Sequence, residues 1–394
     1  MTLYRDRTTQ YRDPTTPYRG KPEVVPGVDY NRTDGISIFL QDKNANRFGR
    51  QLNGANVRSV TWKLNDTPQA EFDFQNFDPT LKTALLLQRD IFVVFNKTIN
   101  VDTGLPETFL GTLGRRKGKP GTHTIIADGF EQWLKERCVE VGSLEYDNVD
   151  QFDIAWGLIQ TAQTGTNYDL GITSSYVPSG KLRYRIYDRV RHQYILDLLR
   201  EFNKIDQGFD QDFIGDPITG HRKWVPYYPS KGSFKPLAHL VWGRNIIDYD
   251  YDENGWATKT KLIQKGASYA GINFEQIYED IAASEKYGAM VGVATDSGQK
   301  DVDWLLAEAI KSVNVLKVPP LSLSVTVKDL PGDPAHNIPA VPIFGAVHTG
   351  DSVQVDIDDG ANQVHGVFRI GTFKYMGPNK YQLTFLNPSA TATI

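Results

Sequence analysis

Residues 148–228 constrain the fold most, because they carry helical and strand patterns between two long β-rich regions. Apolar side chains recur at helical spacing from Asn148 to Gln163, Asn148 and Gln151 have the spacing of a capping box, and Gly165 ends the pattern. After it we expect a strand with Leu182, Tyr184 and Ile186 alternating, a second helix capped by Asp188, and strands at 209–213 and 224–228. The pattern predicts an α+β domain inserted between two β domains.

Length and composition limit the classes of protein. A chain of 394 residues predicts two to four domains, and a net charge of −4 gives no global reason to expect binding to nucleic acid or anionic membranes. The single cysteine, Cys138, excludes an internal disulfide and is expected to be a half-buried apolar residue in a helix at 131–140. The longest apolar runs, 84–87 and 91–95, are far shorter than a membrane span, and the N-terminus has no apolar signal segment. We therefore expect a soluble protein made in the cytosol.

Residues 1–30 form a segment of a different kind. Tyrosine and arginine recur together at heptad spacing, four prolines favour extended chain, and no apolar seam supports a coiled coil. Two interpretations stay open: a disordered tail, or an arm that lies on another subunit, since Tyr and Arg gain most when buried in interfaces. The second makes these residues candidates for partner binding: Tyr4, Arg5, Tyr11, Arg12, Tyr18 and Arg19.

Residues 31–140 predict a first β domain. Strands are expected at 36–40, 57–64, 70–74, 91–96, 108–113 and 122–127, with a hairpin turn at 65–68. Short strands between Gly and Pro turns are typical of a barrel or a sandwich. Residues 114–121 predict a basic hairpin loop, which is either a solvated turn or a contact for a partner or nucleic acid. Its candidate partner-binding residues are Arg115, Arg116 and Lys117.

Residues 236–394 predict a second β domain with an insertion at about 266–317. The Asn254-Gly255 dipeptide predicts a hairpin between strands at 245–251 and 256–264. Residues 266–298 suggest a long loop with a short helical piece at 275–283, and residues 300–317 a helix capped by Asp296 or Ser297. The remaining strands are expected at 321–327, 352–357, 367–372 and 381–386.

The sequence shows no catalytic or metal-binding constellation. The seven histidines are scattered, and neither the zincin nor the Gly-x-Ser-x-Gly pattern occurs. Residues 114–121 fail the Walker spacing. The aspartates at 248, 250 and 252 alternate with tyrosines, which favours a strand with one acidic face over a calcium loop. We therefore expect no enzyme, no cofactor and no metal.

Two β domains with an extended arm suit a part of an assembly better than a catalyst, and two alternative functions stay open. Glu71 and Asp73 share a strand face, which suits a glycan hydrolase, although charged residues on strands more often protect against aggregation. A carbohydrate-binding or receptor-binding module is the other alternative, because exposed aromatic rings stack on sugars. Its candidate residues are Trp224, Tyr227, Tyr228, Trp242 and Trp256.

The order of elements resembles the tail-hub proteins of tailed bacteriophages, also described as minor tail or baseplate hub proteins. The resemblance spans roughly residues 34–390. Residues 59–64 with 70–74 resemble the opening hairpin of such proteins, and residues 109–113 with 124–129 the segment before their inserted domain. Residues 152–159 and 187–202 resemble the two helices of that insert, and residues 316–327 with Gly350-Asp351-Ser352-Val353 the closing barrel.

This resemblance implies a mainly β fold, with two tail-tube-like β-barrel domains (31–140 and 236–394) separated by an α+β insert (141–235) and preceded by the extended arm. It implies a virion protein of the phage tail, made in the host cytoplasm, whose three copies form a ring of six barrels. The ring would join the sixfold tail tube to threefold tip proteins and line or close the DNA channel. The implied partners are a homotrimer of the chain itself, the tail tube or distal tail protein, tip or fibre proteins, the tape measure protein and DNA. No lytic extension is expected, because the chain ends soon after the last strand.

Overall fold

The computed structural model describes residues 35–41, 51–52, 54–75, 90–140, 142–165, 168–216, 221–269, 272–296, 299, 301–319, 321–332, 340 and 343–386. The predicted arm, with Tyr4, Arg5, Tyr11, Arg12, Tyr18 and Arg19, lies outside the described residues. Within the described ranges, no helix is long and apolar enough to cross a membrane. The fold is mainly β, as the sequence predicts.

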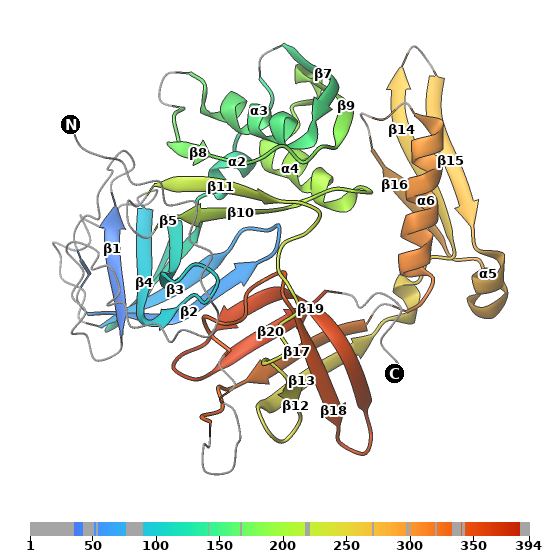
Figure 1. The fold of residues 1–394 in the computed structure, drawn as a ribbon. Coiled ribbons are helices and arrows are strands. Elements are labelled where there is room, and N and C mark those ends of the chain that lie inside the picture. Colours follow the sequence, from blue (N-terminus) through green and yellow to red (C-terminus); the bar gives the residue numbers. More distant parts are fainter. Residues whose placement is uncertain are drawn as a thin grey trace.

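Six strands form the first half of a twelve-stranded sheet (Figure 1). Their order is β1 (Ile36–Gln41), β4 (Asp90–Ile99), β5 (Pro106–Lys119), β6 (Thr122–Gly129), β3 (Gln69–Gln75) and β2 (Ala55–Lys63). The apolar run in β4 is buried on both faces: Ile91, Val93 and Phe95 enter one core, and Phe92 and Val94 a second one. The six predicted strands are confirmed. The hairpin predicted at 114–121 is confirmed, but its loop is shorter than predicted, because β5 continues to Lys119 and its basic residues pair with β6.

The second half repeats the strand order of the first. Its strands are β12 (Leu240–Val241), β18 (Ser352–Asp358), β19 (Gln363–Tyr375), β20 (Tyr381–Phe385), β17 (Leu321–Val327) and β13 (Ile246–Glu253). Antiparallel pairing of β2 with β19 joins the halves, with Trp62 opposite Phe373, and one hydrophobic core runs through both. In the described part of the chain, the end strands β1, β12 and β13 each pair with one neighbouring strand.

The insert packs on the outer face of the first half. It contains β7 (Ser143–Asp150), α3 (Gln151–Gln163), β8 (Ile172–Ser174), β9 (Leu182–Asp188), η1 (Arg189–Arg191), α4 (Ile195–Lys204), β10 (Asp210–Gly215) and β11 (Arg222–Tyr227). Together with α2 (Gln132–Lys135), these elements form a second core that includes Phe39, Phe92 and Leu110 of the sheet. Trp224 lies in this core with no exposed surface.

Several predicted details of the helices are wrong. Asn148 lies in β7, and the carboxylate of Asp150 caps α3 by accepting a hydrogen bond from the Phe152 amide at 2.8 Å. Asp188 caps the short η1 helix, and α4 begins later, at Ile195. The helix predicted at 131–140 is limited to α2, so half-buried Cys138 lies beyond its end.

Strand β9 presents the opposite face from the predicted one. Leu182 is exposed, whereas Arg185 and Tyr187 are buried. Arg185 is buried because its guanidinium lies 3.2 Å from the carboxylate of Asp296 and against the ring of Phe202. A buried ion pair therefore overrides the apolar alternation at this strand.

A small α/β module, residues 255–316, follows β13 and precedes β17 in the chain. In Figure 1 it stands beside the insert. It contains η2 (Gly255–Ala257), β14 (Lys261–Tyr269), β15 (Ile272–Glu279), α5 (Ile281–Tyr287), β16 (Val291–Thr295) and α6 (Val302–Leu316). The predicted Asn-Gly hairpin is wrong, because β13 pairs with β17 whereas β14 pairs with β15 and β16. The loop predicted at 266–298 is also wrong, and Asp301, not Asp296 or Ser297, caps α6.

Candidate functional site

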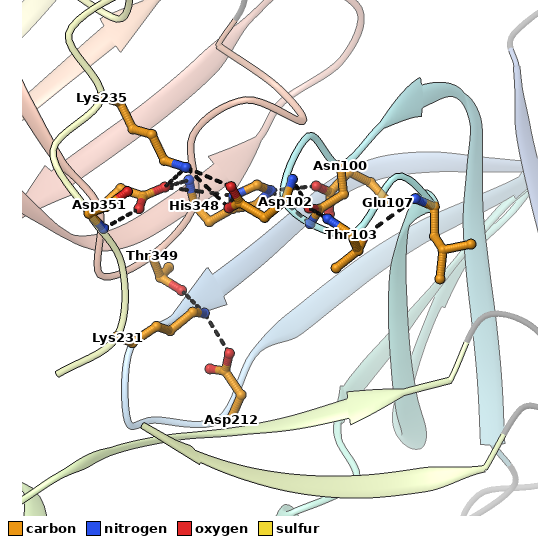
Figure 2. A network of polar contacts seen from close by, with 12 residues as sticks. Asn100, Asp102, Thr103, Glu107, Asp212, Lys231, Lys235, His348, Thr349 and Asp351 are labelled. Carbon is orange, nitrogen blue, oxygen red and sulfur yellow. Dashed lines mark hydrogen bonds and ion pairs between the residues drawn. The ribbon is translucent and has the colours of Figure 1, made fainter. Parts of the chain in front are cut away.

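A cleft of about 520 Å³ lies where the first half, the insert and the second half meet. Its walls come from the β2–β3 hairpin, the β4–β5 loop, strand β10, the linker after β11 and the segment before β18. Aromatic rings line part of it: Trp62 and Phe373 lie edge to face, and Phe344 contacts both. Polar side chains from all three parts converge at the same place (Figure 2).

The centre of the polar network is the His348 cluster, which we define as Asp102, Glu107, Lys235, His348 and Asp351. The Nε2 atom of His348 lies 2.5 Å from Oε1 of Glu107. Its Nδ1 atom lies 3.4 Å from Oδ2 of Asp102 and 3.7 Å from Oδ2 of Asp351. Asp102 and Glu107 belong to the first half, so one imidazole connects the two halves of the sheet.

The charges in the cluster reinforce each other. Burial lowers the pKa of His348, but hydrogen bonds to Asp102, Asp351 and Glu107 outweigh burial and raise that pKa to about 11. The hydrogen bond to His348, opposed by burial and supported by Lys235, holds the pKa of Asp102 well below its ordinary value. The Lys235 ammonium lies 2.9 Å from Oδ1 of Asp102 and 3.8 Å from Oδ2 of Asp351. The imidazolium of His348 and the ammonium of Lys235 therefore lie against the side chains of Asp102 and Asp351.

Three of these side chains also have the spacing of metal ligands. One donor atom from each of Asp102, His348 and Asp351 lies within 4.8 Å of the others. A metal needs a neutral imidazole, however, and the raised pKa of His348 favours the imidazolium. Lys235 supplies a second positive charge against the same aspartates. With His348 protonated and Lys235 against the same aspartates, the arrangement is an ion-pair clamp.

A second set of contacts fastens the linker after β11. The Lys231 ammonium lies 2.5 Å from Oδ2 of Asp212 and donates to Oγ1 of Thr349 at 3.0 Å. Gly232 has φ +87°, and a Cβ atom there would lie 2.3 Å from the carbonyl carbon of Gly350. The linker is thereby held between the insert and the second half at van der Waals distance.

Glu131 is a buried acid on the cleft wall. Glu131 is 3% exposed, and within the described ranges its Oε2 atom has no hydrogen-bond partner. Burial, with Asp212 and Asp66 nearby, raises the pKa of Glu131 well above its ordinary value. The environment therefore favours the uncharged acid.

The predicted basic residues lie away from the cleft. Arg115, Arg116 and Lys117 are exposed on the end of β5, opposite Ile126, Ile125 and Thr124 of β6. The aspartates at 248, 250 and 252 are exposed on β13, as predicted for a strand with one acidic face. The structure brings neither group to the His348 cluster.

The residues of the two alternative functions have other roles in the structure. Glu71 lies 3.8 Å from Arg58, and Asp73 accepts a hydrogen bond from the hydroxyl of Thr124 at 2.7 Å. Trp224 is fully buried and Trp242 packs edge to face on Tyr249, whereas Trp256 is 85% exposed. The proposed aromatic set therefore does not form one exposed sugar-binding surface.

The His348 cluster was missed in the sequence because its members are far apart. His348 and Glu107 are separated by 241 positions. A weak signal exists at Gly350-Asp351, which directly precedes strand β18 as predicted and leaves Asp351 at the start of that strand. The residues that this carboxylate meets depend on the pairing of the two halves, which the local pattern does not contain.

Comparison with known proteins supports the fold. No protein-family model matches the chain, and no curated protein sequence matches it. The tail protein from Neisseria meningitidis is similar in structure, with a TM-score of 0.58, 14% identity and coverage of 89% of this chain and 96% of that one. The 43 kDa tail protein of prophage MuSo2 from Shewanella oneidensis gives a TM-score of 0.56, 13% identity and coverage of 90% and 98%. The prophage tail protein gp18 from Listeria monocytogenes gives a TM-score of 0.55 and 13% identity, with coverage of 90% of this chain and 95% of that one. The chain has the fold of phage tail proteins, which confirms the resemblance seen in the sequence.

Proposed function

We propose that this chain is a structural component of a phage tail tip, a hub that forms a ring between the sixfold tail tube and threefold tip proteins. The observation that carries the proposal is the repeated strand order, with two equivalent halves joined edge to edge through β2 and β19. Three copies supply six such halves, which match a sixfold partner. The ring lines or closes the DNA channel, and the chain acts by assembly, not by catalysis.

The His348 cluster gives the hub its rigidity. It holds the β4–β5 loop of the first half against the linker and the segment before β18. The pair of Arg222 in β11 with Asp90 in β4, both buried, fixes the insert to the first half. Fixed angles between parts are what a ring needs if it is to close with a defined number of subunits.

The proposed partners are further copies of the chain, the tail tube or distal tail protein, tip or fibre proteins, the tape measure protein and DNA. Residues 1–30, with their Tyr-Arg repeat, are proposed as an arm that clasps a neighbouring subunit. The proposed location is the tail of the virion, after synthesis in the host cytoplasm.

The test is the mass and shape of the purified chain, with and without residues 1–30. Light scattering and negative-stain electron microscopy should show a trimer and a ring with six similar lobes. If the full chain forms a trimer and the chain without residues 1–30 does not, the arm is the segment that holds neighbouring subunits together. A chain that stays monomeric at millimolar concentration and also fails to assemble on tail tubes would contradict the proposal.

A further inference from the structure

The two halves differ at their first strand, since β1 pairs antiparallel with β4 and β12 pairs parallel with β18, but they agree in register around β5 and β19. Strands β5 and β19 each skip one residue in their pairing, at Gly114 and Gly371. Directly after Gly114, Arg115 pairs with Ile126 of β6. Directly after Gly371, Thr372 pairs with Thr384 of β20. Arg115 therefore corresponds to Thr372, Arg116 to Phe373 and Lys117 to Lys374.

The same correspondence continues through the next two strands. Ile126 pairs with Glu71, which pairs with Ser59 of β2. Thr384 pairs with Ser324, which pairs with Asp250 of β13. Asp250 thus corresponds to Ser59, and counting along each strand makes Asp252 equivalent to Thr61 and Glu253 equivalent to Trp62.

Within one chain, β2 of the first half pairs with the end of β19, placing Thr61 opposite Lys374 and Trp62 opposite Phe373. Strand β13 of the second half is the equivalent of β2, and the end of β5 in the first half is the equivalent of the end of β19. In the described part of the chain, β13 from Asp248 onwards pairs only with β17, and Arg115–Lys119 pair only with β6. One junction, between β2 and β19, is formed within the chain. The two strands of an equivalent second junction, β13 and the end of β5, are both present but do not pair with each other.

We infer that β13 of one copy pairs with the end of β5 of the next copy, in the register of the β2–β19 junction. This inference rests on the proposed ring and assigns its subunit contact. The register places Asp252 opposite Lys117 and Glu253 opposite Arg116, and two residues beyond Lys117 it places Lys119 opposite Asp250.

Charge supports this pairing independently of the repeat. The side of β5 is basic and exposed at Arg115, Arg116, Lys117 and Lys119, and the side of β13 is acidic and exposed at Asp248, Asp250, Asp252 and Glu253. Opposite charges directly across an antiparallel pair stabilise it, whereas like charges oppose each side pairing with itself. The contact is therefore head to tail, the type that closes into a ring.

Cross-linking tests the register. In a Cys138→Ser background, Lys117→Cys and Asp252→Cys chains are mixed at high concentration and oxidised, since directly opposed Cβ atoms of an antiparallel pair lie about 5 Å apart. We expect disulfide-linked dimers in the mixture and none in either variant alone. A chain with both cysteines should give linked trimers. The control pairs Lys117→Cys with Asn273→Cys, an exposed position on β15.

Charge reversal tests the energetics. Lys117→Glu or Asp252→Lys alone should weaken association at least tenfold, and the double variant should restore it. Lys135→Glu and Glu285→Lys, at exposed positions on α2 and α5, are the matched controls and should leave association unchanged. This inference would be overturned, and the proposed hub left intact, if both single charge-reversal variants form rings normally and the cysteine variants form no cross-links. Absence of both rings and cross-links in all chains would overturn both.

Discussion

Replacing His348 by glutamine should destabilise the junction strongly. Glutamine keeps the size and polarity of the side chain but removes the positive charge that faces Glu107 at 2.5 Å and Asp102 at 3.4 Å. Charges about 4 Å apart attract by roughly 4 kcal/mol at an effective dielectric constant near 20. Removing one partner of a buried pair typically costs about 3–5 kcal/mol, and the low end applies here, because the Glu107 side chain is 10% exposed whereas Asp102 is 54% exposed and is screened by solvent. We expect a loss of about 3 kcal/mol in the free energy of unfolding.

The pH dependence gives this prediction a specific signature. The pKa of His348 rises from 6.5 to about 11 on folding, so its contribution is complete below pH 6.5 and is lost as pH rises towards 11. The lowered pKa of Asp102 acts oppositely: its contribution is present above 3.8 and is lost as pH falls through the folded value. The difference between wild type and His348→Gln should therefore be largest between about pH 4 and 6.5 and shrink above it.

The assay is urea unfolding followed by near-ultraviolet circular dichroism at several pH values. His365→Gln is the matched control, because His365 is exposed and lies 3.2 Å from Asp356; it should change stability by less than about 0.5 kcal/mol. In a double-mutant cycle, Glu107→Gln should cost much less when combined with His348→Gln. A loss below about 0.5 kcal/mol for His348→Gln, or a loss independent of pH, would refute the clamp.

Two further predictions concern other fixed contacts. Arg185→Met should cost about 3–5 kcal/mol in urea unfolding, because Asp296 is 7% exposed and would lose its cation, and an added Asp296→Leu change should recover part of the loss. Gly232→Ala should lower the melting temperature measured by calorimetry, because the new Cβ would lie 2.3 Å from the carbonyl carbon of Gly350; a melting temperature within 1 °C of wild type, as a rough threshold, would refute that close approach.

Local patterns predicted the strands of the sheet well. The alternation in β3 puts Phe72 and Phe74 into the core and leaves Glu71 and Asp73 at the surface. The continuous apolar run of β4 marked a strand buried on both faces, although the sequence did not show that the insert supplies the second face. Helix α6 followed its apolar stripe, with Leu305, Ala309 and Val313 buried.

Failures occurred where a distant residue decides the outcome. Arg185 is buried because Asp296 meets it from the module, and no local pattern contains that partner. The resemblance implied two similar β domains, but the residues themselves did not show the repeat of strand order, because equivalent positions of the two halves share register more than residue type. Thr61 and Trp62 correspond to Asp252 and Glu253, and identical pairs such as Gly114 with Gly371 and Lys117 with Lys374 are too few to reveal the correspondence.

The false hairpin at Asn254 shows how an insertion misleads a local rule. In the first half the β2–β3 hairpin closes directly through residues 64–68, whereas the equivalent β13–β17 pair closes through the whole module. Each doubling of loop length costs only about 0.6 kcal/mol in closure entropy, so a long excursion between Glu253 and Leu321 hardly weakens their pairing. The module adds its own sheet and α6 helix, but its core is small: Leu262, Ala309 and Val313. Its position beside the insert therefore depends on contacts such as Arg185 with Asp296, and that dependence makes the ion pair a determinant of the shape of this side of the molecule.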